Sequence, residues 1–356
     1  MNVRILIGDV RAKLAELPDE SVHCVVTSPP YFGLRDYGVA GQIGLEPTPA
    51  AFVATMVEVF REVRRVLRDD GTLWLNLGDS YSSGGGSHDG RDDNQTGVGA
   101  KRVWLDGSGR ADGIVDERGQ RNRNGTKANG LPSKNLIGIP WRVAFALQAD
   151  GWYLRQDIIW SKPNPMPESV TDRCTKAHEY LFLLSKSARY HYDAAAIAEP
   201  VADATVSRLA QDVECQEGSH RVPGKTNGTM KAVRKRADRF GGNKHGGDTT
   251  KHSDGSVYTG RETRNKRSVW EVCTQPYSEA HFATFPPALI EPCILAGCPK
   301  GGTVLDPFGG AGTTGLVADR LGRNAILVEL NPDYAGMAQT RIKGDSPMFA
   351  DVAGGI

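Results

Sequence analysis

The chain has 356 residues, of which 39% are hydrophobic, and its formal net charge is +1. This length suits one large α/β domain with an appended region, and the near-neutral charge excludes a globally basic nucleic-acid-binding protein, so any such surface must be local. Six cysteines without a CxxC pair, together with the lack of a signal peptide or a membrane-length apolar run, exclude a disulfide-built or membrane-spanning fold and predict a soluble, intracellular protein.

The first 80 residues alternate between apolar runs typical of strands and apolar spacings typical of helices. In chain order the pattern predicts a strand at Val3–Ile7, a helix at Val10–Leu17, a strand at Val22–Val26, a helix at Phe52–Leu67 and a strand at Thr72–Leu77. The second strand runs directly into the sequence Ser28-Pro29-Pro30-Tyr31.

Residues 82–133 differ in kind. They are rich in Gly, Asn, Asp, Ser and Arg and carry almost no periodic apolar positions. This composition predicts a surface insertion, with a lid over a substrate cleft as the alternative.

Regular patterns return with a helix at Pro140–Ala149 and strands at Trp152–Trp160 and Leu181–Leu184. Residues 201–270 then form a second polar region. Between Arg221 and Arg267 there are 13 Lys and Arg against 4 Asp and Glu, a local net charge of +9. A charge run is usually a solvated face, but this one is also suited to contacting phosphates.

The last part of the chain again alternates helices and strands. It predicts a helix at Pro287–Ala296, a strand at Thr303–Leu305, a glycine-rich turn, a helix at Thr313–Leu321, a strand at Ala325–Val328 and a last helix from Asp333. Such alternation predicts an α/β fold with a doubly wound, mostly parallel sheet.

The glycine-rich turn is the clearest ligand signal. Gly309, Gly310 and Gly312 follow a strand that ends at Asp306, and they open a helix. A second strand ends at Glu329, about 20 residues on, where a carboxylate suits a ribose diol. The turn fits neither the GxGxxG nor the P-loop pattern. A glycine turn followed by a carboxylate at the end of the next strand occurs in dinucleotide, ATP and S-adenosylmethionine sites alike.

The proline corner is the second signal. Prolines fix φ and donate no N–H, so the corner is stiff and rich in hydrogen-bond acceptors. Such acceptors would hold the hydrogens of an exocyclic amino group, while the Tyr31 ring stacks on the base that carries it, provided that the base has left its duplex. For the corner alone, an ordinary strand-ending turn is an equally good interpretation.

Together the two signals resemble a known family. TSPPY resembles the catalytic motif, and DPFGGAGTTG the S-adenosylmethionine motif, of the amino-methylating DNA methyltransferases, and their order resembles the β group of that family. Residues 151–187 and 281–302 are also similar to family blocks. The resemblance implies a Rossmann-like, doubly wound and mostly parallel seven-stranded sheet with an inserted basic target-recognition region.

The resemblance also implies roles for particular residues. The target base would be held by Ser28, Pro29, Pro30 and Tyr31. The cofactor, S-adenosyl-L-methionine, would be bound by Asp9, Phe282, Thr284, Pro286, Asp306, Pro307, Phe308, Gly310, Gly312, Thr313 and Glu329. DNA would be contacted by Lys231, Arg234, Lys235, Arg236, Arg264, Lys266 and Arg267, because the basic segment occupies the place of the target-recognition region.

Three parts of the chain follow from this assignment: a catalytic part at 1–200 that contains the insertion 82–133, a target-recognition region at 201–270, and a cofactor part at 271–356. Family members mainly have Ser at the first position of the catalytic motif when they methylate the N4 amine of cytosine, and Asp when they methylate the N6 amine of adenine. Ser28 therefore favours cytosine N4, with adenine N6 as the alternative. The partners would be double-stranded DNA and, in a restriction–modification pair, a cognate endonuclease. A non-catalytic DNA-binding protein with this fold is the rival from another class, and an RNA or protein methyltransferase is a third candidate.

Three further features of the sequence are not expected to take part in the chemistry. Pro292-Cys293 resembles the nucleophile pair that cytosine C5 methylation needs, but it lies in an apolar helical run and predicts packing. His178-Glu179 could suggest a metal ligand or a general base. Because no second His follows at a ligand spacing, the sequence predicts no metal site. Trp270 is predicted to be a core residue rather than a stacking platform.

Overall fold

The computed structural model describes residues 2–34, 36, 38–82, 131–132, 134–202, 263–275 and 285–345, together with the backbone of 351–355. The chain divides into two compact units. One unit contains residues 1–196 and 267–356, and the other contains Ile197–Lys266. Most of the predicted insertion and most of the predicted target-recognition region lie outside the described residues.

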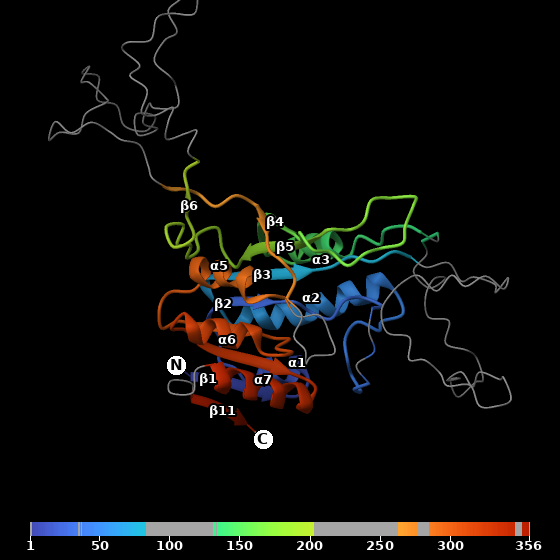
Figure 1. Cartoon of the computed structure of the whole chain (residues 1–356). Helices are drawn as coiled ribbons and strands as arrows, with labels where there is room; N and C mark the ends of the chain where they lie inside the picture. Colours follow the sequence, from blue (N-terminus) through green and yellow to red (C-terminus); the bar gives the residue numbers. More distant parts are fainter. Residues whose placement is uncertain are drawn as a thin grey trace, which may run out of the picture. The chain divides into compact units, whose positions relative to one another are not determined.

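A nine-stranded sheet forms the centre of the larger unit (Figure 1), in the order β11-β1-β10-β9-β2-β3-β5-β4-β8. Its strands are β1 (Asn2–Ile7), β2 (Val22–Thr27), β3 (Leu67–Leu77), β4 (Tyr153–Ser161), β5 (His178–Ser185), β8 (Val269–Glu271), β9 (Thr303–Asp306), β10 (Asn324–Glu329) and β11 (Asp351–Gly355). Among these, β5 runs antiparallel to β3 and β4, and the other pairings are parallel. The predicted Rossmann-like α/β fold is therefore confirmed.

The strand count is larger than the predicted seven. The seven predicted strands form the middle of the sheet, and β8 and β11 extend its two edges. Both edge strands are short, and β11 contains two glycines, so neither has the apolar alternation that marks a strand in a sequence. In addition, β3 begins at Leu67, directly after a helix, instead of at Thr72. Its early part pairs across a register shift between Val22 and Cys24.

Helices cover both faces of the sheet (Figure 1). On one face lie α1 (Val10–Ala15), α2 (Pro49–Val66) and α3 (Ile139–Ala149). The other face carries α5 (Pro287–Gly297), α6 (Thr313–Arg320) and α7 (Pro332–Asp345). Each predicted helix is present within a few residues of its predicted bounds. Because both faces are covered, the central strands are apolar almost throughout, and β2 alone buries five of its six residues.

Local sequence explains where these helices begin. Thr48 precedes α2, and its hydroxyl accepts a hydrogen bond of 3.1 Å from the backbone N–H of Ala51, while Pro49 occupies the first helical position. Such a cap satisfies one of the N–H groups that a helix leaves without an intrahelical partner. The interior of α2 then buries a stripe of large side chains, including Phe52, Met56 and Phe60.

The predicted core residues are buried. Cys293 lies inside α5 with no exposed surface, as the packing interpretation of Pro292-Cys293 predicts. Trp270 is 5% exposed, and its indole N–H donates a hydrogen bond of 2.7 Å to the carbonyl of Arg267. In the part of the chain that the structure describes, no helix is long and apolar enough to cross a membrane.

In the smaller unit, the described residues include a two-stranded antiparallel pair, β6 (Glu199–Pro200) and β7 (Thr263–Arg264). Glu199 forms ion pairs with Arg264 at 3.5 Å and with Lys266 at 3.7 Å. Two of the predicted DNA-contacting residues therefore share one carboxylate. Lys231, Arg234, Lys235 and Arg236 lie outside the described residues.

Candidate active site

The carboxyl edge of the sheet brings the two sequence signals together. The proline corner follows β2, the glycine turn follows β9, and these two strands are hydrogen-bonded neighbours, with Val25 opposite Leu305. In open α/β sheets, ligands bind outside the carboxyl ends of the strands. The corner and the turn therefore form one site, although about 280 residues separate them in the chain.

Asp306 ties these two parts of the site to one another. Its carboxylate accepts hydrogen bonds from the hydroxyls of Thr27 and Thr314, both at 2.7 Å, and from the Phe308 backbone N–H at 3.0 Å. Asp306 is 1% exposed, and this burial raises its pKa to about 6. The two hydroxyls and the N–H donate hydrogen bonds that stabilise the charged carboxylate, and these bonds oppose the rise in pKa.

Glu329 holds the glycine turn from the next strand. One of its carboxylate oxygens accepts a hydrogen bond from the Gly310 N–H at 2.8 Å, and the other accepts one from the Asn331 N–H at 2.9 Å. Burial raises the pKa of Glu329. Each carboxylate oxygen has a second lone pair, so the side chain can still accept hydrogen bonds from a ligand.

The turn itself requires glycine at two positions. Gly310 has φ of 50° and Gly312 has φ of 76°, the left-handed region that L side chains rarely adopt. At Gly312 a Cβ would also lie 2.7 Å from the Cβ of Ala338 in α7. From the same helix, Arg341 donates hydrogen bonds to the Thr313 hydroxyl and the Ala311 carbonyl, at 3.0 and 3.1 Å. The turn is thus held from β10 and from α7.

Asp9 lies at the same edge, after β1. The neighbouring Gly8 N–H donates to the Glu329 carbonyl at 2.9 Å, which places Asp9 close to the end of β10. The Asp9 carboxylate caps α1, accepting from the Arg11 N–H at 2.9 Å, and it also pairs with the Arg11 guanidinium. The hydrogen bond from that guanidinium is the main cause of the lowered pKa of Asp9.

The proline corner carries a polar cluster that sequence reasoning missed. The Tyr31 hydroxyl donates to Glu179 at 2.7 Å and lies 3.2 Å from the Asn76 side-chain oxygen. Glu179 forms an ion pair with Lys162, and both side chains are mostly buried. Asn76 lies in β3, Glu179 lies in β5, and Lys162 directly follows β4, so no local motif joins them. The available signal was the 151–187 block, which contains both Lys162 and Glu179.

Gly78, which directly follows β3, is the floor under the Tyr31 ring. A Cβ at Gly78 would lie within 3.1 Å of three atoms of that ring. Tyr31 therefore packs against bare backbone, and its ring is fixed by shape as well as by its hydroxyl. The next residue, Asp79, caps α3 by accepting from the N–H groups of Gly138 and Ile139.

Among the predicted cofactor residues, the structure brings Asp9, Asp306, Gly310, Gly312, Thr313 and Glu329 to one edge of the sheet together with Pro307 and Phe308. Pro286 is described as the residue that precedes α5, whereas Phe282 and Thr284 lie outside the described residues. Since the side chains of Asp306 and Thr313 bind other protein groups, their clearest role is to hold the turn.

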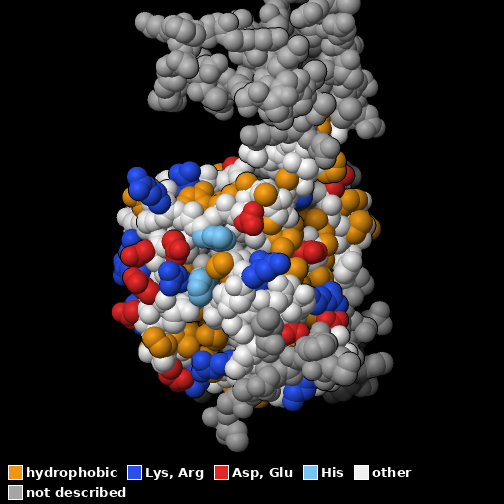
Figure 2. Space-filling view, turned by 90° about the vertical axis from the view of Figure 1, so that its left-hand side faces the viewer, with side chains coloured by type: hydrophobic (Ala, Val, Ile, Leu, Met, Phe, Trp, Pro, Cys, Tyr) orange, Lys and Arg blue, Asp and Glu red, His pale blue; other side chains and the backbone are white. Residues whose placement is uncertain are grey.

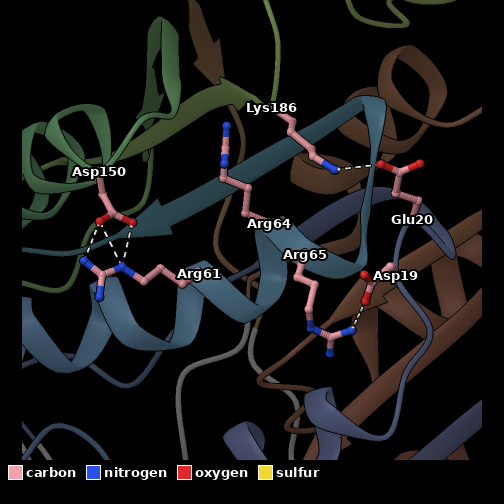
Figure 3. Close-up of a pocket in the computed structure, with 7 residues that line it drawn as sticks. All are labelled: Asp19, Glu20, Arg61, Arg64, Arg65, Asp150 and Lys186. Carbon is pink, nitrogen blue, oxygen red and sulfur yellow. Dashed lines mark hydrogen bonds and ion pairs between the residues drawn. The ribbon is translucent and has the colours of Figure 1, made fainter.

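A pocket of about 350 Å³ lies at the opposite, amino edge of the parallel strands (Figure 3). Ion pairs line it: Arg61 with Asp150, Arg65 with Asp19, and Lys186 with Glu20. In the coloured part of the face seen in Figure 2, which is the left side of Figure 1, basic and acidic side chains are likewise interspersed. This pocket carries neither the corner nor the turn and is therefore not the candidate active site.

In the described ranges, no three or more His, Cys, Asp or Glu side chains gather in a way that could hold a metal ion. The arrangement can hold a small anionic or diol-bearing ligand at the turn and a planar group against Tyr31. Two adjacent subsites of this kind suit a transfer between two bound molecules.

Known proteins resemble this chain in sequence and in fold. A family model described as DNA methylase matches residues 22–340. The type II methyltransferase M.SmaI of Serratia marcescens is 42% identical over 339 residues, covering 95% of this chain and 90% of that protein. The type II methyltransferase M.Cfr9I of Citrobacter freundii is 41% identical, covering 97% of this chain and 89% of that protein.

Solved structures share the fold. The PvuII DNA methyltransferase, described as cytosine-N4-specific, aligns with a TM-score of 0.55 and 18% identity over 96% of this chain and 87% of that one. A Thermus thermophilus protein, TTHA0409, assigned as a DNA modification methylase and solved with S-adenosyl-L-methionine, aligns with a TM-score of 0.52 and 23% identity over 99% of both chains. At these identities the likeness shows the fold alone.

Proposed function

The chain belongs to the DNA methylase family that methylates exocyclic amines at cytosine N4 or adenine N6, and from this premise we propose that it methylates the N4 amine of a cytosine in duplex DNA. Its methyl donor is S-adenosyl-L-methionine. The single observation that carries the choice of cytosine is Ser28, which occupies the first position of the catalytic motif where adenine-specific members mainly have Asp.

The residues at the turn fit this donor. A ribose diol needs a carboxylate acceptor, and Glu329 provides one next to the backbone of Gly310. Gly310 and Gly312 supply the left-handed backbone that the turn needs, and Gly310 carries no side chain that would keep a ligand away. When bound, S-adenosyl-L-methionine supplies an electrophilic methyl group carried on a sulfonium.

The residues at the corner act on the base. The Ser28 hydroxyl and the carbonyls of the proline corner accept the hydrogens of the exocyclic amine, and this turns the nitrogen lone pair away from them. The Tyr31 ring, held between Gly78 and the Glu179 carboxylate, stacks on the base after it leaves the duplex. Catalysis on this account is positioning of the amine, because no covalent enzyme intermediate is required.

Contacts with the DNA backbone are assigned to the basic segment. Residues 221–267 carry a local net charge of +9 and occupy the place of a target-recognition region in the chain. Arg264 and Lys266, which share Glu199, are cations of the kind that binds DNA phosphates. The relatives are named type II methyltransferases, so a cognate restriction endonuclease is a proposed partner.

Incubating unmethylated bacterial DNA with labelled S-adenosyl-L-methionine and digesting it to nucleosides tests the proposal. Label in N4-methylcytosine is the expected result. Label only in N6-methyladenine would keep the family and overturn the base. Cofactor binding without any transfer would favour a non-catalytic DNA-binding protein.

A further inference from the structure

Five polar side chains meet beside the proline corner: Ser28, Tyr31, Asn76, Lys162 and Glu179. Ser28 and Tyr31 follow β2, Asn76 is in β3, Lys162 directly follows β4, and Glu179 is in β5. The family motif accounts for the first two, but it assigns nothing to the carboxylate behind them.

Glu179 is set deep in this cluster. Its side chain is 15% exposed and that of Lys162 is 17% exposed, and the two form an ion pair. Lys162 also lies 4.2 Å above the ring of Trp160. A carboxylate paired in this way accepts hydrogen bonds and cannot donate one. Removing either partner would leave a mostly buried charge without its counterion.

The Tyr31 hydroxyl has one proton to give. It lies 2.7 Å from a Glu179 oxygen and 3.2 Å from the Asn76 oxygen, whose amide nitrogen donates to the Tyr180 carbonyl. Hydrogen bonds to charged acceptors are shorter and stronger than those to neutral ones. The proton therefore points at Glu179, and the Tyr31 oxygen acts as an acceptor toward Ser28.

Ser28 is the next member of the chain. Its hydroxyl oxygen lies 3.5 Å from the Tyr31 oxygen, with Ser28 as the donor. This is longer than a usual hydroxyl hydrogen bond, and such contacts in ligand-free active sites often tighten when the substrate is bound. With its proton directed at Tyr31, Ser28 presents lone pairs to the base.

We propose that Glu179 is a positioning residue. It fixes the direction of the two hydrogen bonds from Ser28 to Tyr31 and from Tyr31 to Glu179, which together form a relay. Ser28 then accepts a hydrogen from an exocyclic amine and repels a carbonyl oxygen at the same place. The inference rests on the proposed function, but it holds for cytosine and adenine alike, since both present an amine. Their deaminated counterparts, uracil and hypoxanthine, present a carbonyl there. The Ser28 oxygen and the carbonyl oxygen of a deaminated base would both be acceptors, so neither would receive a hydrogen bond. A site rejects the wrong ligand in this way.

Two variants break the relay at different points. In Glu179→Gln, Lys162 attracts the new amide oxygen, so the amide N–H₂ faces Tyr31. The Tyr31 hydroxyl can then no longer donate to residue 179, and its proton is free to turn toward Ser28. In Tyr31→Phe, the ring remains but the relay is cut. The matched control is Glu62→Gln, which removes a carboxylate paired with Arg65 on α2, away from the corner.

The measurement is competition between two duplexes in the presence of S-adenosylhomocysteine. Both carry a site mapped on DNA that the wild-type protein has methylated, one with the target base intact and the other with its deaminated counterpart. We expect the preference for the amine over the carbonyl to fall by about tenfold or more in Glu179→Gln and in Tyr31→Phe, which corresponds to one hydrogen bond of about 1.4 kcal/mol. Glu62→Gln should keep the wild-type ratio.

An unchanged ratio in both relay variants, with S-adenosylhomocysteine binding intact, would overturn the role of Glu179. A general loss of binding to both duplexes with the ratio unchanged would also overturn it, because a purely structural residue has that effect. The proposed function is read separately, from the nucleoside that the wild-type protein methylates. If that nucleoside is adenine, the same competition is run with hypoxanthine.

Discussion

The Thr27 hydroxyl donates a hydrogen bond of 2.7 Å to the buried Asp306 carboxylate, across 279 residues of sequence. Thr27 is the last residue of β2 and Asp306 the last residue of β9. This bond therefore joins the strand that carries the proline corner to the strand that carries the glycine turn. It fixes the distance between the two subsites at the point where each leaves the sheet.

Replacing Ser28 with Ala should remove the acceptor that faces the amine. We expect the rate of methyl transfer to fall by about 100-fold or more, a loss typical of a group that positions a reacting atom. Affinity for S-adenosyl-L-methionine should change less than about twofold. Transfer of labelled methyl to DNA and calorimetric titration of the cofactor measure the two effects. Wild-type transfer rates in this variant would exclude Ser28 from the site.

Replacing Gly78 with Ala should displace the Tyr31 ring, because the new Cβ would lie within 3.1 Å of three ring atoms. We expect kcat/KM for DNA to fall by about tenfold or more, with cofactor affinity retained. The control is Gly336→Ala in α7, where a Cβ meets nothing within 4 Å. That variant should keep full activity and gain about 0.5–1 kcal/mol of stability. Equal activity of the two variants would show that the ring needs no such floor.

Asp306 predicts a distinctive dependence of stability on pH. Its pKa in the folded protein, about 6, lies above its ordinary value of 3.8, so the folded state binds the proton more tightly than the unfolded state. This contribution to stability is complete below about pH 4 and is lost as the pH rises through 6. A shift of this size corresponds to about 3 kcal/mol.

Denaturant unfolding of Asp306→Asn and of the wild-type protein between about pH 4 and about pH 8 tests that linkage. Asn keeps an acceptor for Thr27 or Thr314 but does not ionise. The stability of the variant relative to the wild-type protein should therefore rise with pH, mostly between about pH 4 and about pH 7. A difference that is the same at every pH would contradict the raised pKa.

Replacing Glu329 with Ala should weaken the cofactor subsite, because the turn loses its acceptor for the Gly310 N–H and the ribose loses its carboxylate. We expect the affinity for S-adenosyl-L-methionine to fall by about 10- to 100-fold. Glu329→Gln should lose less, since its amide oxygen can still accept from one N–H. Titration of both variants with the cofactor separates these effects, and unaltered affinity in Glu329→Ala would contradict the assignment.

Most of the fold could be predicted from the sequence because its central strands are buried on both faces. The apolar runs of β2, β9 and β10 are short, continuous and bounded by turn residues, which is a local signal. The edge strands β8 and β11 carry no such signal. Nor does apolar patterning reveal that β2 and β9 are neighbours, since their pairing depends on contacts far apart in the chain.

The site could be predicted where its residues are contiguous. Ser28 to Tyr31 and Asp306 to Thr313 each form a short run, so their residue types stand out together. Glu179 and Lys162 do not. Glu179 reaches Tyr31 from β5, and Lys162 reaches Glu179 from the end of β4, so the sequence carries no spacing that relates them to the corner. Gly78 was missed because its role depends on the space next to it. A side chain at this position would clash with the Tyr31 ring, and the sequence does not show that the two are neighbours.

The central claim is that this chain methylates the N4 amine of cytosine. Its most direct test is nucleoside mass spectrometry of DNA from cells that express the wild-type protein, compared with cells that express Ser28→Ala, in a host that makes neither N4-methylcytosine nor N6-methyladenine. The account predicts N4-methylcytosine in the first DNA and none in the second. N6-methyladenine with no N4-methylcytosine would contradict it.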